Sequence, residues 1–205
     1  MADLTTSSRL EAFSDAIIAV AATLLVIDLK LPPEKAEQGL WAFLADQVPT
    51  FAAYVTSFFT ILIFWINHHT LFRSVRQVDR AALFLNGALL LSISFISYAT
   101  SILGTALASG RQDRQAAVFY GAVLLLSSSC FTLLWRHLVS TPKLLLKNSR
   151  ADVSGALRRS AIGPILYFLA CGVALLSPRF SLLLDIAIAG HYAVLPRRTE
   201  VGSRP

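Results

Sequence analysis

The segment Arg9-Leu-Glu-Ala-Phe-Ser-Asp15 continues directly into Ala16-Ile-Ile-Ala-Val-Ala-Ala-Thr-Leu-Leu-Val-Ile27, which places an aspartate at the start of a long apolar helix. A carboxylate that faces lipid at the centre of a membrane helix costs roughly 2.5–3.5 kcal/mol. We therefore expect Asp15 to face protein or water and to have a functional role. The alternative is an aspartate at a helix end that lies among lipid headgroups, where the cost is small.

The amino-acid composition indicates a membrane protein with several spans. Of the 205 residues, 55% are hydrophobic and only 15% are charged, and the mean hydropathy is +0.62, whereas soluble domains contain roughly 25% charged residues. The net charge of +6 does not indicate nucleic-acid binding, because the basic residues lie in the gaps between apolar runs, as membrane topology produces. Cys130 and Cys171 lie inside apolar runs without a ligand motif, and we expect neither a disulfide nor a metal site from them.

Six runs of the chain are apolar enough for membrane helices, which need about 20 mostly apolar residues each. The expected spans are residues 10–31, 48–72, 81–108, 116–138, 161–177 and 180–195, of which the last two are short. The sequence therefore predicts an all-α membrane protein with one six-helix domain over residues 1–196. The basic tail, residues 197–205, has no apolar face, and we expect it to be disordered and cytoplasmic.

The distribution of lysine and arginine predicts the orientation of these spans. An even number of spans places both termini on one side, and this side collects 13 of the 18 basic residues. Because cytoplasmic loops carry an excess of lysine and arginine, we expect both termini in the cytoplasm. The 13 residues are Arg9, Arg73, Arg76, Arg80, Arg136, Lys143, Lys147, Arg150, Arg158, Arg159, Arg197, Arg198 and Arg204.

The first helix has an apolar stripe along one face. At about 100° per residue, steps of three and four residues align the stripe, and Asp15 points about 140° away from it. The face of Asp15 also carries Ala19 and Ala22, which are small enough for close helix contact. From the pattern alone, a lipid-facing or helix-packing surface is the favoured interpretation of the stripe. The stripe consists of Phe13, Ile17, Val20, Leu24, Ile27 and Leu31.

The second helix carries two histidines near its cytoplasmic end. Trp65, His68, His69 and Phe72 are spaced so that they share one face. This end lies at the depth of Arg9 and Asp15, and Asn86 of the third helix is also near it. Three interpretations remain open: a structural polar clamp between helices, a proton site, because histidine titrates near neutral pH, or a metal site of histidine and aspartate ligands.

Two of these patterns resemble one protein family. The pattern Arg9-x-x-x-Phe13-Ser14-Asp15, followed by Ala-Thr-Leu-Leu, and the pattern Trp65-x-x-His68 are similar to those of the bacterial and archaeal homologues of the lysosomal/endosomal potassium channel. The match is most specific over residues 9–32 and 64–72. The other spans fit in number, order and polarity.

The resemblance implies a passive potassium channel of the prokaryotic cell membrane, not an enzyme, and no cofactor besides the permeant K⁺. It implies a single repeat of six helices, a homotetramer, and a pore lined by four copies of the first helix. The narrowest ring would be formed by Val20, with Leu24 and Ile27 as further rings and Thr23 as a hydroxyl layer. A polar cluster would brace the pore helix, consisting of Arg9, Ser14, Asp15, Trp65 and His68.

One position departs from the family pattern. The family commonly has isoleucine or leucine where this chain has Val20, so the narrowest ring should be wider and less selective for potassium over sodium. A proton channel on the same scaffold, a small secondary transporter and an intramembrane metal enzyme remain as alternatives. The sequence assigns no role to His69, His137 and His191.

Overall fold

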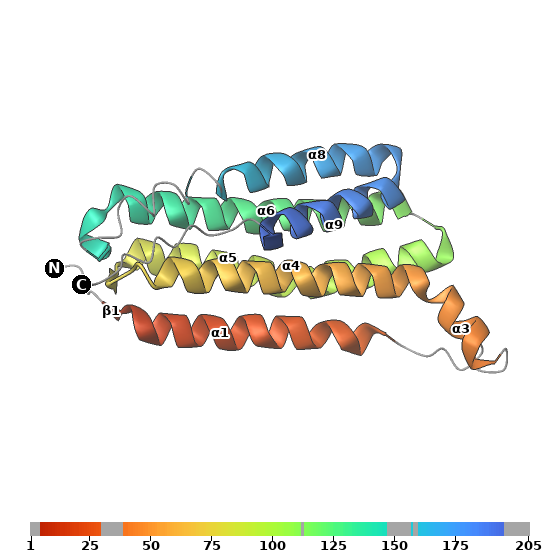
Figure 1. Ribbon diagram of the computed structural model, residues 1–205, viewed down its shortest axis with the longest axis horizontal. Helices are drawn as coiled ribbons and strands as arrows, with labels where there is room; N and C mark the ends of the chain where they lie inside the picture. Colours follow the sequence, from red (N-terminus) through yellow and green to blue (C-terminus); the bar gives the residue numbers. More distant parts are fainter. Residues whose placement is uncertain (1–4, 30–38, 112, 147–156, 158–159, 195–205) are drawn as a thin grey trace.

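Residues 5–29, 39–111, 113–146, 157 and 160–194 are described by the computed structural model (Figure 1). Seven α-helices make up most of this part of the chain. The elements in order are β1 (Thr5–Thr6), α1 (Ser7–Leu24), the 3₁₀ turn η1 (Leu25–Asp28), α3 (Leu40–Asp46), α4 (Val48–Phe72), β2 (Gln77–Val78), α5 (Arg80–Ser109), α6 (Asp113–Ser140), the 3₁₀ turn η2 (Pro142–Leu144), α8 (Ile162–Leu176) and α9 (Pro178–Val194).

The long helices form an elongated bundle in which α1 and α8 lie at opposite edges (Figure 1). α1 packs against α5 and α4, whereas α8 packs against α6 and α9. The most extensive pairing is that of α5 with α6, and fully buried Leu89, Ile93, Leu124 and Leu134 lie in the core between the layers. Among the described residues, α1 therefore has neighbouring helices on one side only.

The helix ends follow local chemistry. α5 begins where the Asp79 side chain accepts a hydrogen bond from the Ala82 N–H at 2.8 Å, which satisfies one of the free amides of the first turn. The same helix ends at Gly110, whose φ of 64° lies in the left-handed region that glycine adopts without a side-chain penalty. Pro49 occupies the first turn of α4, where its missing N–H has no cost.

Four helices are long and apolar enough to cross a membrane, namely α1 with its continuation to Ile27, α4, α5 and α6. They correspond to the first four expected spans. The expected spans 161–177 and 180–195 coincide with α8 and α9, which have 15 and 17 residues, and their crossing of the membrane stays a prediction. The chain is thus an all-α protein with four long apolar helices.

The first expected span is not one continuous α-helix. α1 ends at Leu24 and tightens into a 3₁₀ turn through Asp28, a common way to satisfy the last carbonyls of a helix. Residues 30 and 31 of this span, and the tail 197–205, lie outside the described residues.

The sequence patterns did not predict two small features. β1 and β2 pair antiparallel, with Thr5 opposite Val78 and Thr6 opposite Gln77. The loop after α4 is also bonded to the segment after α6, through the Arg76 N–H to the Leu144 carbonyl at 2.8 Å. The start of α1, the α4–α5 loop and the end of α6 are therefore joined at one end of the bundle. Strands of two residues are too short to give a periodic pattern.

Candidate pore helix and its polar cluster

α1 has one buried face and one open face. Ser14, Ile18, Ala21 and Leu25 are each at most 2% exposed and pack towards α4 and α5. Most of the apolar stripe lies on the open face, where the exposed fractions are 58% for Phe13, 55% for Val20, 44% for Leu24 and 62% for Ile27. We call these four exposed residues, Phe13, Val20, Leu24 and Ile27, the apolar ladder. The described part of the chain leaves the ladder uncovered, and an apolar surface of this length needs lipid or another protein surface against it.

The packed face differs from the one expected beside Asp15. Ala19 is exposed and Ala22 half-buried, and Ile17 of the stripe is half-buried as well. The buried face is therefore centred on Ser14 and Ala21, about a quarter turn from Asp15. Thr23 is exposed, and its hydroxyl donates to the Val20 carbonyl at 2.9 Å, so that its side chain stays next to the Val20 position.

Behind α1, three buried side chains form a chain of hydrogen bonds. His68 of α4 donates from Nε2 to the Asn86 Oδ1 of α5 at 2.8 Å, and the Asn86 amide donates to the Ser14 hydroxyl at 2.9 Å. Ser14 donates in turn to the Leu10 carbonyl at 2.8 Å. Because all three residues are fully buried, these hydrogen bonds connect three helices in a place where water cannot replace a lost partner.

A second set of polar contacts lies nearer the surface. The Trp65 indole N–H donates to the Asp15 carboxylate at 2.9 Å, and the Trp65 ring stacks on His69 with 5.9 Å between ring centroids. His69 Nδ1 lies 3.0 Å from the Glu11 carboxylate. The Asp15 carboxylate is therefore held by Trp65 of α4.

The five residues expected in one polar cluster thus fall into separate groups. Ser14 and His68 are joined through Asn86, and Asp15 and Trp65 form their own pair. Arg9 is exposed and has no hydrogen bond or ion pair among the described residues. Asn86 lies at the centre of the buried group. Its signal in the sequence is an amide inside an apolar run near the cytoplasmic end of the expected third span.

The histidines do not converge as a metal site would require. His68 stacks on Phe72 with 4.4 Å between ring centroids and bonds to Asn86, whereas His69 bonds to Glu11. Within the described part of the chain, no group of three or more histidine, cysteine, aspartate or glutamate residues is placed to hold a metal ion. The metal interpretation therefore finds no support from this end of α4.

One further contact supports α1 at the level of the apolar ladder. The Ser97 hydroxyl of α5 donates to the Ala21 carbonyl of α1 at 2.8 Å. Ala21 directly follows Val20, so this bond holds the backbone of α1 next to the ladder. No sequence signal distinguishes Ser97 from the other serines of α5, because Ser92, Ser94 and Ser101 lie in the same apolar run.

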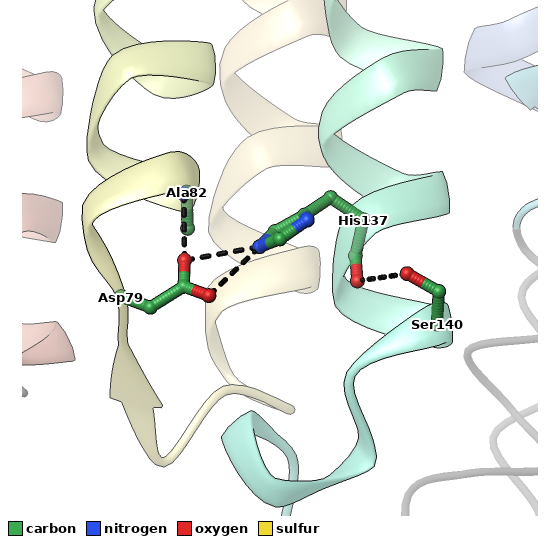
Figure 2. Close-up of polar contacts among 4 residues, drawn as sticks. All are labelled: Asp79, Ala82, His137 and Ser140. Carbon is green, nitrogen blue, oxygen red and sulfur yellow. Dashed lines mark hydrogen bonds and ion pairs between the residues drawn. The ribbon is translucent and has the colours of Figure 1, made fainter. Parts of the chain in front are cut away.

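His137 forms an ion pair at the end of the bundle where α5 begins. Figure 2 shows its Nε2 facing the carboxylate of Asp79, with 3.0 Å to each oxygen. Burial of Asp79 raises its pKa, but the hydrogen bonds from the Ala82 N–H and from His137 outweigh this effect. The pKa of Asp79 therefore lies below its ordinary value. The pair joins α6 to the cap of α5.

Comparison with known proteins gives the family. A profile of the family described as endosomal/lysosomal potassium channel TMEM175 matches residues 9–96. A protein of Streptomyces collinus named as a potassium channel is 38% identical over 187 residues, which cover 91% of this chain and 91% of that one. The chain belongs to the TMEM175 family. The resemblance drawn from its first two helices is thereby confirmed, and the family is one of multi-pass ion channels rather than enzymes.

Two further TMEM175 relatives bear on fold and function. The crystal structure of a lysosomal potassium-selective channel TMEM175 homologue from Chamaesiphon minutus has a TM-score of 0.84 and 32% identity, and the match covers 91% of this chain and 96% of that one. The human protein, named as an endosomal/lysosomal proton channel, is 40% identical over 96 residues, which are 43% of this chain and 18% of the human one. The family match includes α1, α4 and the polar contacts between them.

Proposed function

We propose that this chain is the subunit of a homotetrameric potassium channel whose pore is lined by the open face of α1. The single observation that supports this most is the exposed apolar ladder with Val20 at its middle, on a helix at the free edge of the bundle. Four such ladders facing one axis would cover one another. The polar contacts behind α1 hold it against α4 and α5 and leave the ladder free.

In the proposed mechanism, selection and gating occur at apolar rings. An ion that crosses a ring of four Val20 side chains sheds water or brings it through, and a small decrease in radius dewets the ring and closes it. Leu24 and Ile27 form further rings towards the outside, and Thr23 lies beside them. A modest tilt or rotation of α1, restrained by Trp65 and Asn86, changes the radius.

The proposed orientation places the joined end of the bundle in the cytoplasm. The ends of α1, α4, α5 and α6 that meet there carry exposed Arg9, Arg73, Arg76, Arg136 and Lys143, and lysine and arginine concentrate on the cytoplasmic side of membrane proteins. α8 and α9 are the fifth and sixth spans in this proposal. The membrane is the prokaryotic cell membrane.

Ion flux from purified protein in liposomes tests the proposal. We expect outward potassium flux faster than sodium flux, and its loss in Val20→Trp, because four indole rings would fill the ring. Leu126→Trp on α6 is the matched control, since Leu126 is also 55% exposed, and its flux should be normal. Val20→Ile should raise the ratio of potassium to sodium flux. Normal flux in folded Val20→Trp would contradict the proposed pore.

A proton channel is the second candidate, and the name of the human relative favours it. The two candidates share the scaffold and differ in the permeant ion. Current under symmetrical potassium with a pH gradient distinguishes them. Proton current under these conditions, without potassium-selective flux, would replace the first proposal.

A further inference from the structure

A buried carboxylate lies in the half of the bundle far from α1. Asp185 of α9 is 1% exposed, and its Oδ1 has no hydrogen-bond partner among the described residues. In the sequence it is one acidic residue within the apolar run Leu182-Leu-Leu-Asp-Ile-Ala-Ile188. None of the contacts around α1 uses it.

The helices packed against α9 are α8, α4 and α6. α8 contributes Tyr167 and Cys171, and α6 contributes Tyr120, all three of which interact electrostatically with Asp185. From α4, the Ser57 hydroxyl is bonded to the Tyr120 hydroxyl at 2.9 Å. No lysine, arginine or histidine of the described residues forms an ion pair with Asp185.

An unpaired charge in such a place is strongly unfavourable, so a buried carboxylate takes a cation or a proton. A metal or alkali cation needs several oxygen ligands. Two hydroxyl groups of the helices packed here are already engaged, because Ser57 also accepts from Thr100 at 2.7 Å, and Ser181 donates to the Ala170 carbonyl at 3.1 Å. The donor set suits a proton, which needs one oxygen.

We propose that Asp185 is a proton-binding site inside the subunit, and that its proton is bound whenever α8 and α9 are packed against α4 and α6. Release of the proton leaves a charge with no partner and loosens this packing. A hydroxyl chain from Tyr120 through Ser57 to Thr100 joins α6 to α4 and α5 beside the site, and α5 bonds to α1 through Ser97. The site does not depend on which ion the pore conducts.

Infrared spectroscopy of the purified full-length protein tests this proposal. At neutral pH we expect the carbonyl band of a protonated carboxylic acid, at the high-frequency position of a carbonyl without a hydrogen bond. The band should be absent in Asp185→Asn and present in Asp113→Asn, a matched control at the surface end of α6. A spectrum with only ionised carboxylate bands, or a carboxylate band that shifts between potassium and sodium, would overturn the proposal.

A titration of the unmodified protein provides the second readout, which also decides the question if Asp185→Asn does not fold. As the pH is raised and the acid band disappears, the melting temperature should fall in parallel, and Asp185→Asn should not show this fall. Loss of the band without any change in melting temperature would contradict the link to packing. Neither readout measures ion flux, so failure here and failure of the proposed channel are distinguishable.

Discussion

At the scale of single residues, Asn86 connects the helices behind the apolar ladder. Its amide accepts from His68 and donates to Ser14, and all three side chains are buried. A residue in this position supplies hydrogen-bond partners to two polar atoms that burial separates from water. The contribution of Asn86 is therefore best measured as the stability that the protein loses when Asn86 is replaced.

We expect Asn86→Ala to lower the free energy of unfolding by about 1–3 kcal/mol, because His68 and Ser14 each lose a partner where water cannot enter. Thermal unfolding in detergent measures this. Ser94→Ala on the same helix is the matched control, since within the described part of the chain the Ser94 hydroxyl bonds to the Leu90 carbonyl of its own helix alone. Equal melting temperatures for the two variants would show that the hydrogen-bond chain contributes nothing.

The sequence was informative about residue types and less informative about their partners. Helical spacing identified Asp15 and His68 as residues of two facing helices, but it does not say which atoms meet. The structure pairs Asp15 with Trp65 and His68 with Asn86. Which side chains meet depends on how each helix is rotated about its own axis. The sequence pattern predicted that α1 packs with the face of Ala19, whereas the structure packs it with the face of Ser14 and Ala21.

At the scale of elements, close packing of α6 on α8 depends on a glycine. A methyl group added at Gly121 would lie 2.8 Å from the Cys171 Sγ atom, which is inside contact distance. At Gly172, one residue further along α8, the added group meets nothing within 4 Å. A comparison of alanine substitutions at the two glycines therefore separates the effect of packing from the effect of helix propensity.

Gly121→Ala should lower the melting temperature, because overpacking costs about 1–3 kcal/mol and exceeds the gain of up to about 1 kcal/mol in helix propensity. Gly172→Ala should leave it unchanged or raise it. Adding Cys171→Ala to Gly121→Ala should restore much of the loss, since the clashing sulfur is gone. If Gly121→Ala is as stable as Gly172→Ala, the helices are less tightly packed than described.

The cap of α5 gives a pH dependence of known sign. The pKa of Asp79 is lowered in the folded protein, so its contribution to stability is complete above the ordinary value of 3.8 and is lost as the pH falls through the lowered value. Asp79→Ala should cost about 1 kcal/mol at neutral pH, and Asp79→Asn, which keeps a capping oxygen, should cost less. Both should weaken the acid-induced loss of stability. An acid unfolding curve identical to that of the unmodified protein would refute this.

The number and order of the long helices could be predicted from apolar runs, because length and composition dominate at this scale. The ends of the helices and the segments between them could not be predicted as well. The 3₁₀ turn after Leu24, the helix α3 and the β1–β2 pair depend on short-range geometry and on contacts between distant segments. The lengths of α8 and α9 leave their membrane crossing as a proposal.

At the scale of the whole molecule, the role of α1 depends on what covers its open face. The chain belongs to the TMEM175 family, and its fold matches that of a channel of known structure. A single copy leaves Val20, Leu24 and Ile27 exposed, and in the proposed assembly four copies cover them around a pore. If lipid covered this face instead, Val20 would have no contact with permeating ions.

Accessibility of position 20 to Ag⁺, a thiol-reactive ion close in size to K⁺, shows whether the open face of α1 lines the pore. Val20→Cys and Ile18→Cys, each in a chain with Cys130 and Cys171 replaced by alanine, place a thiol on the open and on the buried face of α1. We expect Ag⁺ to block potassium current rapidly in Val20→Cys and not in Ile18→Cys. Unchanged current in Val20→Cys, or equal block in both variants, would contradict a pore lined by the open face of α1.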